Sequence, residues 1–266
     1  MSFVEVCQGD SPIVLGLPHT GTDLPEDSAT GLTEVGRALA DTDWFVDELY
    51  AGLLPDLTTV RTRVHRYVID VNRDPSGQSL YPGQNTTALC PVTDFDGNAL
   101  YHPGAEPDDA EVARRLETYH APYHAALRRE MERVREMHGV AILYDCHSIR
   151  SVAPYLFAGR LPDLNIGTND STSCALVFET AVASVCAAAG DYTSVVNGRF
   201  KGGWTTRHYG RPAEGWHAIQ MELAQSTYLK AEAPPWPVSL RSADRLRAVL
   251  TLVLKTLSGI ALWRPS

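Results

Sequence analysis

The chain has 266 residues, a length that suits one large α/β domain, with 44% hydrophobic and 21% charged residues. Its net charge of −9 argues against general binding to nucleic acids or anionic membranes. Its five cysteines are scattered and include no CxxC pair, which favours a reducing compartment over a disulfide framework. The sequence contains no recognisable signal peptide and no apolar run long enough to cross a bilayer. We therefore expect a single cytoplasmic domain over residues 1–266.

Apolar runs and helical periodicities alternate along the chain. Residues 75–105 hold many Gly, Pro, Asn and Asp, which predicts a long loop that forms a lid or pocket wall. The longest amphipathic pattern contains Pro122, which is expected to kink or divide its helix. The alternation predicts an α/β fold with a mixed, mostly parallel sheet flanked by helices. The predicted strands are 13–17, 66–71, 140–144, 153–158, 192–196 and 218–223, and the predicted helices are 33–54, 108–138, 174–189 and 242–257.

Two histidines follow or end predicted buried strands. His19 follows the run Ile13–Leu17, and His147 lies in Asp145-Cys146-His147-Ser148, after another apolar run. Ligands of open α/β sheets bind at the carboxyl ends of the strands, where these side chains are expected. A single histidine there is often only hydrogen-bonded, but two from different strands favour a shared metal ion.

A glutamate interrupts a third apolar strand. Glu222 lies between Met221 and Leu223, and a carboxylate buried there without a partner would be costly. Either the strand is at the edge of the sheet and Glu222 faces solvent, or Glu222 points into a polar site. Two histidines and a carboxylate can hold a zinc ion and activate a water molecule, which indicates a metal-dependent hydrolase.

Arginines in two segments could bind an acidic ligand. Arg73 lies in Asp70-Val71-Asn72-Arg73-Asp74, where it could clamp a substrate carboxylate or be neutralised by the neighbouring aspartates. Arg207 and His208 lie in a glycine-rich stretch with aromatic residues, which could wrap a small ligand or be a surface turn. His208 and His217 could both line the pocket. His120 and His124 are one helical turn apart, but no glutamate follows His120, so they do not form a zincin helix.

These residues together resemble the N-formylglutamate deformylase (N-formylglutamate amidohydrolase) family over about residues 12–229. None of the short matching stretches is specific alone, but seven in the same order are. They are Pro18-His19-Thr20-Gly21, Asp41-Thr42-Asp43-Trp44, residues 66–75, Asp145-Cys146-His147-Ser148, Ile166-Gly167-Thr168, residues 200–210 and Gln220-Met221-Glu222-Leu223.

The family is similar in turn to zinc carboxypeptidases, and this resemblance implies roles for individual residues. His147 would bind zinc, Asn72 and Arg73 would bind the substrate carboxylate, and Glu222 would be the general base. Zinc carboxypeptidases have a glutamate three residues after their first histidine, whereas this chain has Thr22. The third ligand must then come from elsewhere. Asp43 is our choice beside His19 and His147, with Asp23 and Asp41 as alternatives.

The resemblance implies a zinc-carboxypeptidase-like fold and hydrolysis of N-formyl-L-glutamate to L-glutamate and formate, a step of histidine degradation. Glu222 and Arg73 would be catalytic, and the remaining substrate-binding residues would be Asn72, Arg207, His208 and Gly167. Cobalt, manganese or iron would suit the same ligands as zinc. Alternatives are another N-acyl-amino-acid deacylase, a carboxypeptidase-like hydrolase, or a non-catalytic protein that binds acidic amino acids. The expected partner is a small acidic substrate, with no nucleic acid and no membrane; the sequence does not determine the oligomeric state.

Overall fold

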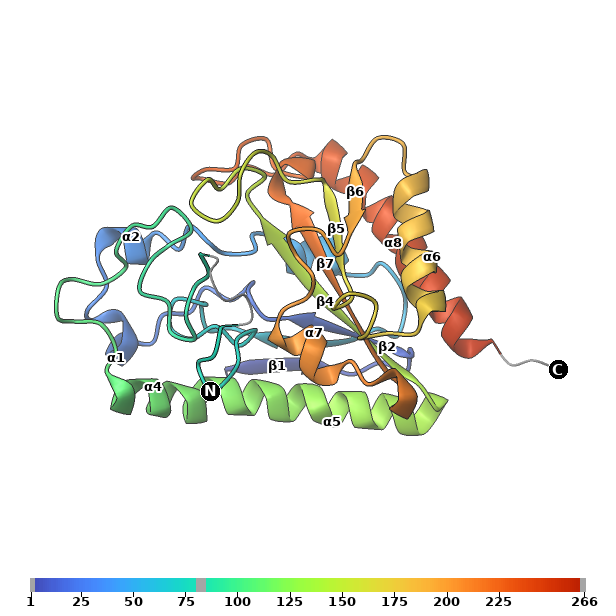
Figure 1. Cartoon of the computed structure of the whole chain (residues 1–266), viewed down its shortest axis with the longest axis horizontal. Helices are drawn as coiled ribbons and strands as arrows, with labels where there is room; N and C mark the ends of the chain where they lie inside the picture. The colour runs from blue at the N-terminus through green and yellow to red at the C-terminus, as the bar shows by residue number, and fades with distance from the viewer. Residues whose placement is uncertain (1–2, 80–84, 264–266) are drawn as a thin grey trace.

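The computed structural model describes residues 3–79 and 85–263, and these contain a seven-stranded sheet (Figure 1). The strand order is β1-β3-β2-β4-β7-β5-β6. The pairs β2–β3, β2–β4, β4–β7 and β5–β6 are parallel, and the pairs β1–β3 and β5–β7 are antiparallel. The strands are β1 Val4–Cys7, β2 Ile13–Leu17, β3 Thr58–Thr62, β4 Ala141–Ile149, β5 Leu164–Gly167, β6 Ser194–Val196 and β7 Trp216–Ala224.

Helices cover both faces of the sheet. One apolar core packs α3, α6 and α8 against the central strands, and a second core on the opposite face packs α5 against β2, β3, β4 and β7 (Figure 1). Because β4 and β7 are buried on both faces, all nine residues of each are buried. The α-helices are α1 Glu26–Ala29, α2 Glu34–Arg37, α3 Val46–Tyr50, α4 Asp109–Arg115, α5 Ala121–His138, α6 Leu176–Ala188, α7 Trp204–Tyr209 and α8 Leu240–Leu262.

Short helical turns of other kinds connect these elements. A π-helical turn, Leu116–His120, joins α4 to α5 directly before Pro122, so the predicted long helix is divided as expected. Two 3₁₀ turns, Pro212–Glu214 and Gln225–Thr227, flank β7.

The predicted fold class is confirmed, together with the strands at 13–17, 140–144, 192–196 and 218–223 and the helices at 174–189 and 242–257, within a few residues at their ends. The likeness of the fold to zinc carboxypeptidases and the domain bounds 1–266 remain predictions. None of the described helices is long and apolar enough to span a membrane.

Three predicted elements are wrong. Residues 66–71 form turns instead of joining the sheet. The side chains of residues 67–69 pack into small clusters with residues 89–90, residues 100–101 and α4, and Val71 packs in the core around α5. Residues 153–158 are also turns, and the strand comes later, as β5. The predicted helix 33–54 is broken into α2 and α3, because Leu39 and Phe45 adopt left-handed backbone conformations. The segment between α2 and α3 contains Asp41, Thr42 and Asp43.

Two strands escaped prediction. β3 reads Thr-Thr-Val-Arg-Thr, and its residues alternate between buried and half-buried, so its buried positions are mostly threonine rather than strongly apolar. β1 pairs with it at the edge of the sheet and is only four residues long.

Candidate metal and catalytic site

The two predicted histidines and Asp43 meet at the carboxyl ends of the central strands. β2 delivers His19 through Pro18, and β4 carries His147. Asp43 comes from the break between α2 and α3, where its backbone N–H donates a hydrogen bond to the carbonyl oxygen of His19, 3.0 Å long. All three side chains are almost completely buried. The tertiary structure thus joins three segments that are far apart in the sequence.

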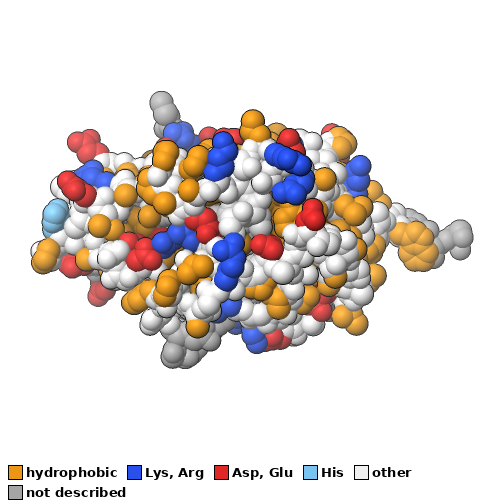
Figure 2. All heavy atoms as spheres, turned by 90° about the horizontal axis from the view of Figure 1, so that it is seen from above, with side chains coloured by type: hydrophobic (Ala, Val, Ile, Leu, Met, Phe, Trp, Pro, Cys, Tyr) orange, Lys and Arg blue, Asp and Glu red, His pale blue; other side chains and the backbone are white. Residues whose placement is uncertain are grey.

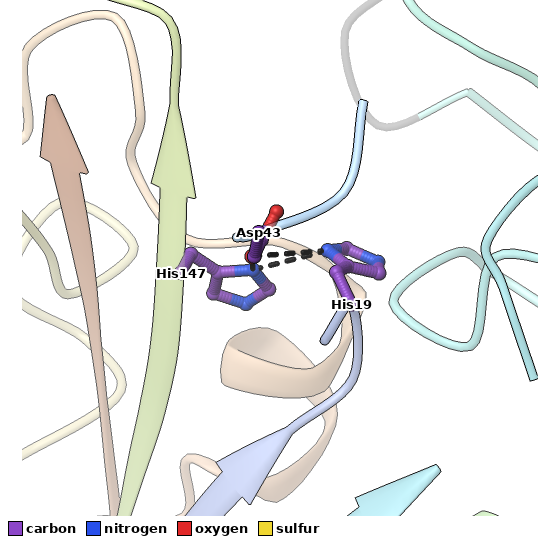
Figure 3. A group of neighbouring side chains, drawn as sticks. All are labelled: His19, Asp43 and His147. Carbon is purple, nitrogen blue, oxygen red and sulfur yellow. Dashed lines mark hydrogen bonds and ion pairs between the residues drawn. The ribbon is translucent and has the colours of Figure 1, made fainter. Parts of the chain in front are cut away.

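These side chains turn their donor atoms toward one another (Figure 3). The Nδ1 atoms of His19 and His147 are 3.1 Å apart. The Oδ2 atom of Asp43 lies 3.2 Å from Nδ1 of His147 and 3.7 Å from Nδ1 of His19. Two imidazole nitrogens and one carboxylate oxygen converging on a buried point form a donor set that suits zinc and similar divalent ions. The group His19–Asp43–His147 could therefore bind a metal ion.

Carboxylates contact the outer nitrogens of both rings. Nε2 of His19 lies 2.6 Å from Oδ1 of Asp70, and Nε2 of His147 lies 3.0 Å from Oδ2 of Asp145. The side-chain amide of Asn72 is 3.2 Å from the same nitrogen of His147. A carboxylate that accepts a hydrogen bond from the outer N–H group keeps the proton on Nε2 and leaves the lone pair of Nδ1 directed inward, as metal-binding histidines require. The surroundings of the rings therefore fit a metal ion.

The charges of this group stabilise one another. Burial alone would raise the pKa of Asp43, but hydrogen bonds and charges from His147 and His19 lower it well below its usual range. Burial would also raise the pKa of Asp70, yet the charges of His19, Arg73 and Arg66 lower it well below its usual value. Both aspartates are thus anionic at neutral pH.

The contact between Asp70 and His19 leads to a testable prediction. Asp70 accepts hydrogen bonds from His19, from Nη2 of Arg66 at 2.7 Å and from the backbone N–H of Asn72 at 2.9 Å. Asp70→Asn should weaken metal binding about 10- to 100-fold, because the amide no longer holds the His19 ring in its ligating tautomer. Titration of the metal-free protein with zinc in a competing chelator measures this change, and unaltered affinity would contradict it.

Glu222 lies beside His147 on the neighbouring strand. The two residues are register partners in the parallel pair β4–β7, and β7 is an interior strand, so the solvent-facing alternative for Glu222 is wrong. Its side chain lines the pocket described below. Burial raises the pKa of Glu222 to about 7, with the charge of His147 acting in the opposite direction. A carboxyl group with this pKa can exchange protons near neutral pH.

A hydrogen-bond chain fixes the orientation of Glu222. Nε2 of Gln220 donates to Oε2 of Glu222 at 3.0 Å, while Oε1 of Gln220 accepts from the backbone N–H of Gly203 at 2.7 Å. Gly203 packs so closely on Asn72 that a Cβ atom at this position would lie 2.4 Å from the Asn72 amide nitrogen. The glycine-rich stretch therefore supports both Glu222 and Asn72.

An open pocket lies over these groups. Five of the predicted site residues line it, namely His19, Asn72, Arg73, His147 and Glu222. Asp43 is not part of the lining. The sequence analysis did not assign the remaining lining residues. They are Arg66, Asn85, Thr86, Thr87, Phe95, Ser148, Ile149, Leu156, Arg199, Phe200, Gly202, Gly203 and Gln220.

Three predicted substrate-binding residues lie outside this lining. Gly167 is packed against Gly202, whose nitrogen would be 2.5 Å from a Cβ atom there. Nε of Arg207 donates to the carbonyl oxygen of Gly202, and His208 stacks on Trp204 with its Nε2 3.1 Å from Arg128. Their roles in substrate binding remain predictions.

The other two acidic candidates for the metal ligand lie apart from the two rings. Asp23 forms an ion pair with Arg63, 2.7 Å long, and Oδ2 of Asp41 accepts a hydrogen bond from the backbone N–H of Phe95. Neither belongs to the group that converges with His19 and His147 in the described part of the chain. Asp43 is therefore the better choice.

Two histidines that the sequence analysis set aside contact the backbone on either side of Asn72. Nε2 of His124 lies 2.7 Å from the carbonyl oxygen of Val71, and Nε2 of His120 lies 3.1 Å from that of Arg73. These two contacts enclose Asn72 between them in the chain. The π-helical turn before α5 ends at His120 and thus supplies one of the contacts.

His217 lies at the opposite end of β7 and outside the lining of this pocket. Its Nδ1 accepts a hydrogen bond from the backbone N–H of Ala175, which precedes α6, and burial lowers its pKa to about 4. Because the unfolded chain binds this proton more tightly, the stabilisation is complete above about pH 6.5 and is lost as the pH falls toward 4.

His217→Asn should therefore flatten the pH dependence of stability. The amide oxygen can still accept the bond from Ala175 but does not titrate in this range. We expect the wild type to lose up to about 2 kcal/mol more than the variant between pH 7 and pH 4.5. Urea unfolding at both pH values measures the difference, and the exposed His102, replaced in the same way, is the control. If the free energy of unfolding changes equally with pH in the wild type and in His217→Asn, the prediction is refuted.

The α/β fold thus places a buried His-Asp-His group, which could bind a metal ion, beside a carboxyl group of raised pKa. Residues 11–229 match the N-formylglutamate amidohydrolase family. The chain belongs to this family, which confirms the resemblance seen in its motifs.

Individual relatives agree with this assignment. Over 252 residues the chain is 45% identical to an N-formylglutamate deformylase of Pseudomonas putida, covering 94% of this chain and 93% of the relative. It is 43% identical to an N-formylglutamate deformylase of Pseudomonas aeruginosa, covering 94% of each. The crystal structure of an N-formylglutamate amidohydrolase from Ralstonia eutropha JMP134 superposes with a TM-score of 0.79 at 26% identity, covering 98% of this chain and 97% of the other.

Proposed function

We propose that this chain is a cytoplasmic enzyme that hydrolyses N-formyl-L-glutamate to L-glutamate and formate with the help of a divalent metal ion, zinc in the first instance. The observation that carries the proposal is the buried group His19–Asp43–His147 with Glu222 beside it on the neighbouring strand. The two relatives that are 45% and 43% identical, and are named N-formylglutamate deformylases, support the choice of substrate.

His19, Asp43 and His147 would hold the metal ion. When bound, it would supply Lewis-acid chemistry by polarising the formyl carbonyl and lowering the pKa of a nearby water molecule. The buried carboxylates Asp70 and Asp145 keep the two rings in place for this purpose.

Glu222 would move the protons. Its carboxylate takes a proton from the water molecule whose oxygen attacks the formyl carbon. It then gives this proton to the nitrogen of glutamate as the carbon–nitrogen bond breaks, so that formate and the free amine leave. The hydrogen bond from Gln220 to Oε2 orients the carboxylate for these transfers.

Arg73 would bind a substrate carboxylate. Its Nε donates to the carbonyl oxygen of Thr87 and its Nη2 to Oγ1 of the same residue, both at 2.9 Å, which orients the planar guanidinium group. Local arginines are needed because the protein as a whole repels anions. The face seen in Figure 2 mixes basic, acidic and apolar side chains instead of presenting one extended basic field.

Formate release from N-formyl-L-glutamate tests the proposal. The purified protein should release formate, lose activity with a chelator and regain it when zinc is added. N-acetylglutamate and small peptides, assayed in parallel, test the alternative acyl groups and carboxypeptidase activity. No release from any of these substrates by the metal-loaded protein, together with glutamate binding that survives the chelator, would instead favour a non-catalytic binding protein.

A further inference from the structure

Three arginines line the pocket, and their surroundings differ. They are Arg66, Arg73 and Arg199. Arg66 is only 6% exposed, donates to Asp70 at 2.7 Å and lies 3.8 Å from Oδ1 of Asp43. Its guanidinium group also lies over the ring of Phe95, 4.8 Å from the centroid. Arg66 therefore balances the charge of the carboxylates around the two histidines and is poorly accessible to a ligand.

Arg73 and Arg199 contact the two ends of one short piece of the pocket wall, residues 85–87. Arg73 is bonded to Thr87, as described above, and Nη2 of Arg199 donates to the carbonyl oxygen of Asn85 at 3.4 Å. Arg199 also donates to the carbonyl oxygen of Leu156, with distances of 3.3 and 3.4 Å. Its guanidinium group lies 5.4 Å from the ring centroid of Phe200. These contacts orient the side chain of Arg199 within the lining of the pocket.

The two arginines differ in their connection to the metal-binding group. Nη1 of Arg73 lies 3.8 Å from Asp70, which holds His19, and Arg73 follows Asn72, whose amide lies beside His147. Arg199 is bonded to Leu156 and Asn85, and neither of these contacts His19, Asp43 or His147 through a hydrogen bond described here. Arg73 is thus linked to the metal-binding group through Asp70 and Asn72, whereas the hydrogen bonds of Arg199 tie it to a different part of the pocket wall, at Leu156 and Asn85.

N-formylglutamate has two carboxylates, one near the formyl group and one at the end of its side chain, which could pair with these two arginines. The α-carboxylate is attached to the same carbon as the formylated nitrogen, whereas the side-chain carboxylate is three carbon–carbon bonds from that carbon atom. Resting on the proposed function, we propose that Arg199 is the specificity-determining residue that binds the side-chain carboxylate, while Arg73 binds the α-carboxylate. The apolar walls formed by Ile149, Leu156 and Phe200 suit the two methylene groups between them.

This assignment replaces the role that the sequence suggested for Arg207. Arg199 lies between β6 and α7 and lines the pocket, whereas Arg207 lies within α7 and does not line it. The enzyme should therefore prefer glutamate over amino acids with uncharged side chains because of Arg199. A bidentate arginine–carboxylate pair supplies both the affinity and the directionality for such a choice.

A cycle of two substrates and two proteins tests the proposal. The substrates are N-formyl-L-glutamate and N-formyl-L-norvaline, which has a methyl group in place of the side-chain carboxylate. Arg199→Met should lower kcat/KM for formylglutamate about 10- to 100-fold, mainly through KM, because a hydrogen-bonded charge pair is lost. It should leave kcat/KM for formylnorvaline within about twofold, since that substrate never makes the contact. Arg73→Met should lower kcat/KM for both substrates.

Controls separate this role from a structural one. Arg160→Met removes an arginine that donates to Ser226 outside the pocket and should leave both substrates unaffected. Metal content and circular dichroism of Arg199→Met should match the wild type. If that variant does not fold, Arg199→Lys, which keeps the charge but loses the fork, should retain an intermediate preference for formylglutamate.

The outcomes also distinguish this proposal from the proposed function. If the wild type releases no formate from formylglutamate, the proposed function fails. The assignment of Arg199 is wrong if the wild type is active but Arg199→Met lowers kcat/KM equally for both substrates. It is also wrong if the variant keeps the full preference for formylglutamate. Loss of the preference in Arg207→Met and not in Arg199→Met would transfer the role to Arg207.

Discussion

Glu222→Gln should lower kcat by about 10²- to 10⁴-fold, the range that general acid–base catalysis contributes. The amide has nearly the same shape as the carboxylate but can neither accept the proton of the attacking water molecule nor return it to the leaving amine. Because Glu222 is assigned as the base and not as a ligand, the variant should keep its metal ion. Formate release under saturating substrate, combined with metal analysis of the same preparation, measures both properties.

The role of Glu222 as a base also predicts how kcat/KM of the wild type depends on pH. A protonated Glu222 cannot act as a base, so kcat/KM should fall as the pH drops through the pKa of this group. Burial raises the pKa of Glu222 to about 7, and a bound divalent cation, by favouring the carboxylate, would bring it below that value. The acid-side decrease in kcat/KM should therefore occur below pH 7. The residual activity of Glu222→Gln should not show this decrease.

A buried glutamate elsewhere is the matched control for this variant. Glu179 on α6 accepts hydrogen bonds from Thr168 and from Ser171 and does not line the pocket. Glu179→Gln should leave kcat within a few-fold of the wild type, whatever it does to stability. If Glu222→Gln loses its metal ion together with its activity, Glu222 is a ligand, and if it stays active, another group is the base.

The parts of this site that lie on buried parallel strands could be predicted from the sequence. His19 follows a continuous apolar run and His147 comes after another, so both were expected at the carboxyl edge of the sheet, whereas Glu222 within a third run was left open between a polar site and a solvent-facing edge. The pairing of His147 with Glu222 could not be predicted, because strand order depends on packing between distant segments. The sheet places β7 next to β4, and this neighbourhood turned an ambiguous strand glutamate into a buried site residue.

The parts that depend on irregular backbone could not be predicted. Apolar spacing over residues 33–54 favoured one helix, yet left-handed conformations at Leu39 and Phe45 break it and bring Asp43 to His19. Arg199 was overlooked because its bonded partners are backbone carbonyls of residues 85 and 156, and backbone groups leave no signal in a sequence. Its position just before Phe200-Lys201-Gly202-Gly203, one of the family-like stretches, was the available hint.

Asp43→Asn should nearly abolish metal binding and, in proportion, formate release. The two imidazole nitrogens would keep their positions, but the anionic oxygen that lies 3.2 Å from Nδ1 of His147 would become part of a neutral amide. The loss in zinc affinity should exceed the roughly 10- to 100-fold expected when only an outer carboxylate is changed. Competition with a chelator of known affinity measures it, and a large excess of zinc should restore part of the activity, since the catalytic groups remain.

The two aspartates that the sequence left open provide the controls for this variant. Asp41→Asn and Asp23→Asn change the same type of side chain in the same region, but Asp41 accepts a hydrogen bond from Phe95 and Asp23 pairs with Arg63. Both variants should bind zinc as the wild type does. A variant of Asp41 or Asp23 that loses the metal ion while Asp43→Asn retains it would reassign the third ligand. Equal loss in all three would show that the acidic residues act through the fold of the segment between β2 and β3 and not by direct ligation.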